Sequence, residues 1–151
     1  MRALCTSKFK YFAEDAEFRP GAYAVNCSKI SLGRRVVIRP GSQLMADSYE
    51  EITIEDDVQM GPGIHIYVNN HRFDDMNTPI IDQDYLPSEP VRLKKGCWVG
   101  ANAIILPGVT IGENSVIAAG SVVTKSIPDG VVAAGCPARV IREIGSARRG
   151  P

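Results

Sequence analysis

The sequence predicts an all-β protein in which the chain winds as a parallel β-helix, a solenoid built from six-residue repeats. The first observation is an aliphatic residue at every sixth position of one long stretch: Leu93, Val99, Ile105, Ile111, Ile117 and Val123. The second is a small or medium-sized residue two positions before each of these: Val91, Cys97, Ala103, Val109, Ser115 and Ser121. Residues two apart in a strand share a face, so each pair points inward together. Six copies of a short repeat in one phase are typical of a β-helix.

The same spacing is present in the first half of the chain. It runs over residues 30–44 and returns over residues 52–66. Between these ranges the phase slips, so the stretch MADSYEEI at 45–52 is predicted to be an insertion at a bulged corner.

A chain of 151 residues is long enough for one domain with its own core. We expect the β-helix over residues 18–137. Residues 1–17 are polar with a few aromatics and are predicted to form an N-terminal arm or short helix. Residues 138–151 are expected to form a C-terminal cap and loose tail, in which ARVIREI is a closing strand or short helix.

The six-residue pattern is absent from one internal segment, HRFDDMNTPIIDQDYLPSEP at residues 71–90. A structureless segment of this length within a compact solenoid is usually functional. The pattern resumes in phase at Val91, so we expect a long loop that leaves and rejoins the coil at the same corner.

Composition narrows the classes of function. The formal net charge is zero, with 17 basic and 17 acidic residues, which indicates neither nucleic acid nor an anionic membrane as a partner. No apolar run resembles a signal peptide or is long enough to span a bilayer. The four cysteines form no CxxC motif and are interpreted as reduced thiols of a cytoplasmic protein, with Cys97 packed in the core.

One continuous motif carries a resemblance to a known family. The stretch WVGANAIILPGVTIGENSVIAAGSVVTKSIPDGVVAAGCPARVIREI resembles the end of galactoside and maltose O-acetyltransferases, and also the smaller O-acetyltransferases of surface-polysaccharide gene clusters. These are hexapeptide-repeat acyltransferases. The resemblance implies a left-handed coil with three repeats per triangular turn, although the general rule for parallel crossovers would favour a right-handed one. Residues eighteen apart, such as Leu93 and Ile111, should then stack on one another.

The resemblance also implies a reaction: transfer of an acetyl group from acetyl-CoA to a sugar hydroxyl, in a homotrimer with sites between chains. In the family a histidine at the root of the long loop is the catalytic base, and His71 matches that place. Histidine is the side chain that most readily exchanges a proton near neutral pH. A solvated corner histidine is the alternative for His71, and it is the preferred interpretation of His65. No nucleophile motif such as GxSxG is present, so direct transfer is expected.

Small residues mark the expected position of the acyl-CoA. Gly100, Ala101, Ala118 and Ala119 point outward on one side of the coil, where a pantetheine arm would fit and a backbone amide of Gly100–Ala101 could face the thioester. Small residues also favour tight corners, which is the alternative explanation. The resemblance further assigns Thr124, Lys125, Arg139 and Arg142 to the nucleotide and Trp98 to the substrate site. An ordinary solvated end of the coil is the alternative for the first four, and packing or an interface for Trp98.

Two departures from the family bear on the acceptor. An asparagine that helps to hold the sugar has no counterpart in IRPGSQ, and the N-terminal helical region is largely missing. Acetylation of an amino sugar or of a xenobiotic is therefore the alternative activity. A zinc hydratase similar to γ-class carbonic anhydrase is disfavoured, because the spacing and loop context of His65 and His71 do not fit its ligands, so no metal is expected. A non-catalytic trimeric scaffold is a third possibility.

Overall fold

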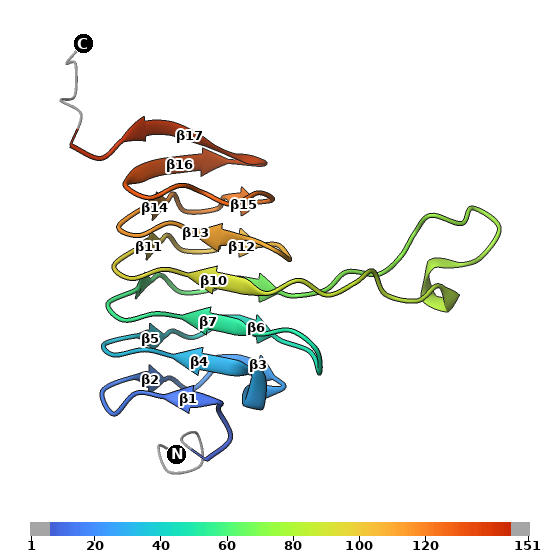
Figure 1. The fold of residues 1–151 in the computed structure, drawn as a ribbon, viewed down its shortest axis with the longest axis horizontal. Coiled ribbons are helices and arrows are strands. Elements are labelled where there is room, and N and C mark those ends of the chain that lie inside the picture. Colours follow the sequence, from blue (N-terminus) through green and yellow to red (C-terminus); the bar gives the residue numbers. More distant parts are fainter. Residues whose placement is uncertain (1–6, 146–151) are drawn as a thin grey trace.

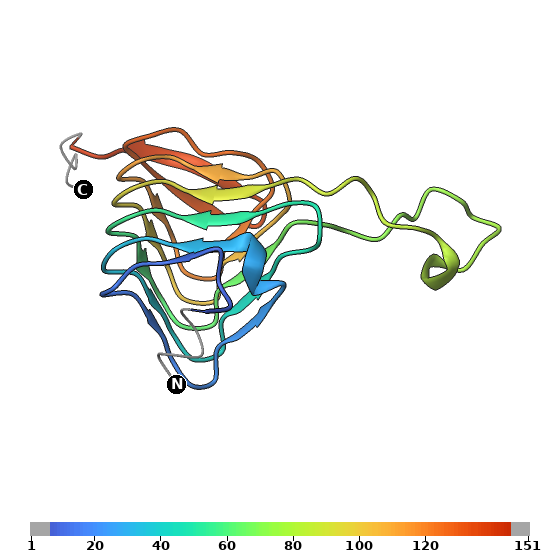
Figure 2. The ribbon, with the colours of Figure 1, turned by 60° about the horizontal axis from the view of Figure 1, so that its bottom comes forward.

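The computed structural model describes residues 7–145, which form a parallel β-helix of triangular cross-section with one long projection (Figures 1 and 2). The first face of the prism stacks β1 (Tyr11–Phe12), β4 (Ile30–Leu32), β7 (Ile52–Ile54), β10 (Val91–Leu93) and β13 (Thr110–Ile111). The second contains β2 (Glu17–Phe18) and β5 (Val37–Ile38), then β8 (Gln59–Met60), β11 (Trp98–Val99), β14 (Val116–Ile117), β16 (Val131–Gly135) and β17 (Ala138–Glu143). The third stacks β3 (Tyr23–Val25), β6 (Gln43–Met45), β9 (His65–Tyr67), β12 (Ile104–Ile105) and β15 (Val122–Val123).

The stacking register confirms the predicted solenoid. Arg92 lies opposite Thr110, and Leu93 opposite Ile111, as expected for residues eighteen apart. Each strand is only two to six residues long, so the fold depends on hydrogen bonds and packing between successive turns. Within residues 7–145, no helix is long and apolar enough to cross a membrane.

The core is a continuous column of the inward-facing repeat residues. Leu93, Ile105 and Ile111 are fully buried, as the pattern predicts. Cys97 is also buried; burial raises the pKa of its thiol to about 12, so it packs as a small neutral side chain. The inward Ser115 is satisfied within the core, because its hydroxyl donates to the carbonyl of Pro128 at 2.6 Å and accepts from the Val131 amide at 3.1 Å.

The coil begins earlier than the sequence predicts. Tyr11 in β1 already pairs with Ser31 in β4, so much of the segment expected to be an N-terminal arm belongs to the coil. Aromatic residues replace aliphatic ones here: the rings of Phe12 and Phe18 lie 5.4 and 5.6 Å from that of Phe9 at the lower end of the core. The aliphatic pattern therefore did not reveal this turn. The remainder of the expected arm, residues 1–6, lies outside the described residues.

The opposite end of the coil is closed by an antiparallel strand. β17 pairs with β16, with Ala134 opposite Arg139, which settles the closing segment as a strand rather than a helix. Ala138, the first residue of β17, is buried. The predicted tail at 146–151 lies outside the described residues.

The three corners of the prism differ in character. At the corner between the first and second faces, oppositely charged residues pair across successive turns, as in Arg34–Asp56 at 2.8 Å and Arg35–Asp57 at 2.5 Å. The corner between the second and third faces carries small residues, as at 100–103 and 118–121, and is called the trough corner. The corner between the third and first faces bears two insertions and is called the arm corner.

Both predicted insertions lie at the arm corner, but the prediction that the longer one is structureless is wrong. The bulged corner occupies residues 46–51, between β6 and β7. The long loop leaves after β9 and returns at β10, and projects far from the coil as an arm (Figure 1). The arm, residues 69–90, contains a 3-10 turn, η2 (Ile80–Asp82), and internal hydrogen bonds, so it is not structureless.

Candidate active site

His71 lies at the root of the arm, where the outgoing and returning segments of the arm run antiparallel. It forms a β-bridge with Tyr85, and their rings are 4.4 Å apart at an angle of 31°. The Arg72 amide donates to the Asp84 carbonyl at 2.8 Å, and the Leu86 amide donates to the Asn70 carbonyl at 2.9 Å. The backbone around His71 is thus fixed, while its side chain remains exposed.

A single carboxylate ties the arm to the bulged corner. Asp47 Oδ1 accepts from the backbone amides of Tyr49 and Glu50, both at 2.8 Å. Its Oδ2 accepts from the side-chain Nδ2 of Asn69 at 3.3 Å and from the Ser88 hydroxyl. Burial alone would raise the pKa of Asp47, but hydrogen bonds from Glu50, Ser88 and Tyr49 outweigh it, so the pKa lies below its ordinary value. Asp47 is therefore ionised at neutral pH.

The tip of the arm is closed by a second set of hydrogen bonds. The Gln83 side-chain amide donates to the carbonyls of Asp75 and Thr78, both at 2.8 Å. The Asp75 carboxylate accepts from the Thr78 hydroxyl at 2.6 Å and the Asn77 amide at 2.9 Å. These bonds hold an exposed segment in one conformation without a hydrophobic core.

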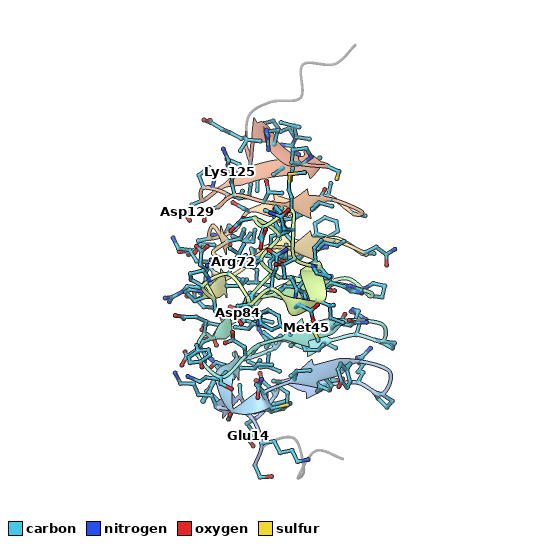
Figure 3. The ribbon with its side chains drawn as sticks, turned by 90° about the vertical axis from the view of Figure 1, so that its right-hand side faces the viewer. Glu14, Met45, Arg72, Asp84, Lys125 and Asp129 are labelled. Carbon is cyan, nitrogen blue, oxygen red and sulfur yellow. The ribbon has the colours of Figure 1, made fainter. Side chains whose placement is uncertain are left out.

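An open cleft of 610 Å³ lies between the bulged corner and the arm root. Its lining includes Tyr49 from the corner and Arg72 and Tyr85 from the arm. Figure 3 looks onto this side of the molecule, with Arg72 and Asp84 near the middle of the coil's height. Tyr85 contacts His71 and also lines the cleft, whereas His71 is not part of the lining.

The trough corner shows why small residues occur there. A Cβ atom added to Gly100 would lie 2.5 Å from the Ala119 nitrogen, and one added to Gly61 would lie 2.5 Å from the Ala101 nitrogen. Stacking of the turns thus accounts for these glycines, as the alternative interpretation held. The Gly100 amide donates to the Ile117 carbonyl at 2.8 Å. Within residues 7–145, the backbone amides of Ala101 and Ala119 donate no hydrogen bond to another group of the protein.

The other predicted site residues are divided between corners. Arg139, opposite Ala134, lies at the end of the trough corner. Thr124 and Lys125 follow β15 at the arm corner; Lys125 appears above the arm in Figure 3. Trp98 and Arg142 belong to the second face, where the Trp98 side chain is 53% exposed. One chain therefore brings together Gly100, Ala101, Ala119 and Arg139, but separates them from His71 by the width of the third face.

His65 lies on the outer side of the third face, in β9, and is partly buried. Its Nδ1 is 3.2 Å from the Tyr67 hydroxyl. Among residues 7–145, no group of three histidine, cysteine, aspartate or glutamate side chains is placed to share a metal ion.

The coil of six-residue repeats is the fold of the hexapeptide-repeat transferases. A family model described as bacterial transferase hexapeptide, with six repeats, matches residues 90–125. The chain is 38% identical over 142 residues to a galactoside O-acetyltransferase of Escherichia coli K12, covering 94% of this chain and 68% of that protein. It therefore belongs to the hexapeptide-repeat acetyltransferases and is a CoA-dependent acyltransferase.

Two solved structures agree with this family. A galactoside acetyltransferase in complex with coenzyme A is 37% identical, with a TM-score of 0.82 over 95% of this chain and 70% of that chain. A maltose O-acetyltransferase from Clostridium difficile 630 is 30% identical, with a TM-score of 0.80 over 95% of this chain and 74% of that one. The chain thus spans about two-thirds to three-quarters of the length of these relatives.

Proposed function

We propose that this protein is a cytoplasmic O-acetyltransferase that transfers the acetyl group of acetyl-CoA to a sugar hydroxyl, in the synthesis of a surface polysaccharide. The observation that carries the proposal is the exposed His71 on a braced arm root, in a chain whose relatives include galactoside and maltose O-acetyltransferases. Acetylation of an amino sugar or a xenobiotic is the competing activity. A screen of amine and hydroxyl acceptors under the same conditions, read as thiol release from acetyl-CoA, separates the two.

The chemistry requires one base and one oxyanion donor. The imidazole of His71 accepts the proton of the acceptor hydroxyl while that oxygen bonds to the thioester carbonyl carbon. The carbon–sulfur bond then breaks, and the proton passes from the imidazole to the departing CoA thiolate. The Ala101 amide is the better donor to the developing oxyanion, because that of Gly100 is already bonded to Ile117.

The trough corner is suited to the thin pantetheine arm. Ala101 and Ala119 offer unused amides, and small side chains leave the backbone approachable. Arg139 at the end of the trough corner would neutralise phosphate charge, as would Arg142 on the adjoining face. Thr124 and Lys125 would reach the nucleotide from the arm corner, and Trp98 would contact substrate from the second face. The chemistry of acyl transfer calls for no metal in this arrangement.

The active enzyme in this proposal is a homotrimer with its sites between chains. His71 and the trough belong to different corners of one chain, so a neighbour's trough completes the site. The arm presents strongly exposed apolar side chains for such a contact, with Met76 at 99%, Ile81 at 85% and Phe73 at 66% exposure.

Subunit mixing tests this arrangement directly. His71→Ala chains lack the base, and Ala119→Trp chains have a blocked trough, so each is inactive alone. Co-refolded mixtures should regain part of the thiol release from acetyl-CoA, because some interfaces then pair an intact histidine with an open trough. Mixed chains that form trimers without regaining activity would place a complete site in each chain. A monomeric wild-type enzyme with full activity would contradict the shared site as well.

A further inference from the structure

The cleft beside the arm root has the size of a small-molecule site. Its 610 Å³ falls within the usual range of roughly 300–1,000 Å³ for ligand pockets. It is bounded by the bulged corner on one side and the arm on the other, and both are secured by Asp47. The walls are therefore preformed.

Tyr49 is the most conspicuous group on this cleft. Its side chain is 81% exposed, although its backbone is fixed on both sides. Its amide donates to Asp47 Oδ1 at 2.8 Å, and its carbonyl accepts from Lys29 Nζ at 3.3 Å. An aromatic ring presented to solvent on a fixed backbone is a ready platform for the apolar face of a sugar ring.

The polar groups of the cleft suit a polyhydroxyl ligand. Arg72 keeps 49% of its side chain exposed, and its nearest carboxylate, that of Asp74, is 3.8 Å from Nε. Asp47 is the other charged residue of the lining, and both its oxygens already accept hydrogen bonds from the protein. Beyond its 3.8 Å ion pair with Asp74, the guanidinium of Arg72 donates no hydrogen bond within residues 7–145, so its N–H groups can bind hydroxyl or carboxylate oxygens of a ligand.

The cleft lies beside His71 and does not include it. Tyr85 stacks on His71 at 4.4 Å and also lines the cleft, but His71 does not. A single sugar held on Tyr49 would therefore lie beside the base. A saccharide of two residues could occupy the cleft with one residue and present a hydroxyl of the other to His71.

We infer that this cleft is a second acceptor subsite, which holds one sugar residue of an extended saccharide while the neighbouring residue is acetylated. The inference rests on the proposed sugar O-acetyltransferase activity and narrows its acceptor to an oligosaccharide or polysaccharide chain. Tyr49 supplies the stacking surface, and Arg72 supplies hydrogen bonds to ring substituents.

Acceptor length is the variable that tests the subsite. Thiol release from acetyl-CoA is measured with β-1,4-linked galactose and glucose saccharides of one to four residues. In the better series, kcat/KM should rise about ten-fold from one to two residues and then level off. Tyr49→Ala should reduce the ratio of the two-residue to the one-residue kcat/KM to about one. Tyr11→Ala, which removes a 55% exposed tyrosine from the first face, should keep the wild-type ratio.

A binding measurement separates failure of the subsite from failure of the proposed function. Saturation-transfer NMR with the disaccharides and the His71→Ala variant needs no turnover. Tyr49-dependent disaccharide binding without acetylation of any saccharide would preserve the subsite and overturn the activity. Monosaccharides acetylated as efficiently as disaccharides, with a ratio unchanged by Tyr49→Ala, would overturn the subsite and leave the activity in place.

Discussion

The coil and the arm are stabilised by different interactions. Inward residues of the coil such as Leu93 and Ile111 are fully buried, and each turn is bonded to the next. In the arm, residues 69–90, no side chain is fully buried. Its conformation depends on a few polar groups, chiefly Asp47 at its root and Asp75 with Gln83 at its tip.

This difference separates stability from activity. Burial of apolar surface gives the coil a large and cooperative contribution to folding. The arm contributes little such burial, so its order can change while the coil stays intact. The catalytic histidine in our proposal stands where the two regions meet.

The largest expected effect is on activity alone. His71→Ala should lower the rate of acetyl transfer by on the order of 10²–10⁴, because the general base is lost. The exposed position of His71 predicts no loss of coil stability, and binding of acetyl-CoA should persist. Thiol release and calorimetric binding of acetyl-CoA measure both properties. His65→Ala is the matched control in β9; if it were the inactive variant and His71→Ala active, the assignment would be wrong.

The opposite effect is expected in the coil. Ile105→Ala creates a cavity in the fully buried column and should cost about 2–5 kcal/mol of unfolding free energy. Urea unfolding followed by circular dichroism measures this loss. Asp82→Ala in the arm changes an exposed side chain outside the proposed apolar contact between chains and should leave the coil's unfolding unchanged. Equal destabilisation by both variants would show that arm and coil unfold as one unit.

The coil could be predicted from the sequence because its inward-facing residues recur at a fixed six-residue spacing. A six-residue repeat indicates which side chains face inward, and the pairing of Leu93 with Ile111 followed directly. The first turn was missed because Phe12 and Phe18 replace aliphatic residues there. The small residues at Gly100 were ambiguous, since a ligand trough and a tight corner require the same residue type.

The arm root was predictable only in part. Interruption of the repeat located the arm and His71, but not the residues that support them. Asp47 and Ser88 are 41 positions apart, and neither belongs to a motif, so their contact could not be derived from spacing. The one signal was the slip of phase at residues 45–52, which marked the corner where Asp47 lies. Tyr49 and its cleft became visible only once both insertions were placed together.

Both corners of the proposed CoA site can be tested with one pair of ligands. Charge reversal at Arg139 on the trough corner, or at Lys125 on the arm corner, should weaken CoA binding by about ten-fold through loss of phosphate contacts. Pantetheine, which lacks the nucleotide, should bind both variants nearly as well as wild type. Isothermal calorimetry with both ligands makes the comparison. Equal weakening for CoA and pantetheine would show that these side chains do not contact phosphate.

The smallest expected effect concerns the link between the two regions. The carboxylate of Asp47 only accepts hydrogen bonds. In Asp47→Asn one of its two oxygens becomes an NH2 group, which cannot accept from the same donors. The amides of Tyr49 and Glu50 should then exchange with solvent roughly ten-fold faster, while core amides such as that of Ile105 keep their protection. Asp57→Asn, on the charged corner, is the control and should leave the exchange of Tyr49 and Glu50 unchanged.

The pH dependence of this amide protection has a definite sign. Because the folded-state pKa of Asp47 is lowered, its contribution is complete above its ordinary value of about 4 and disappears as pH falls through the lower folded value. Protection of Tyr49 in the wild type should therefore decline only in that acidic range, and Asp47→Asn should abolish the decline. An arm root that loses protection near neutral pH would assign its order to a group other than Asp47.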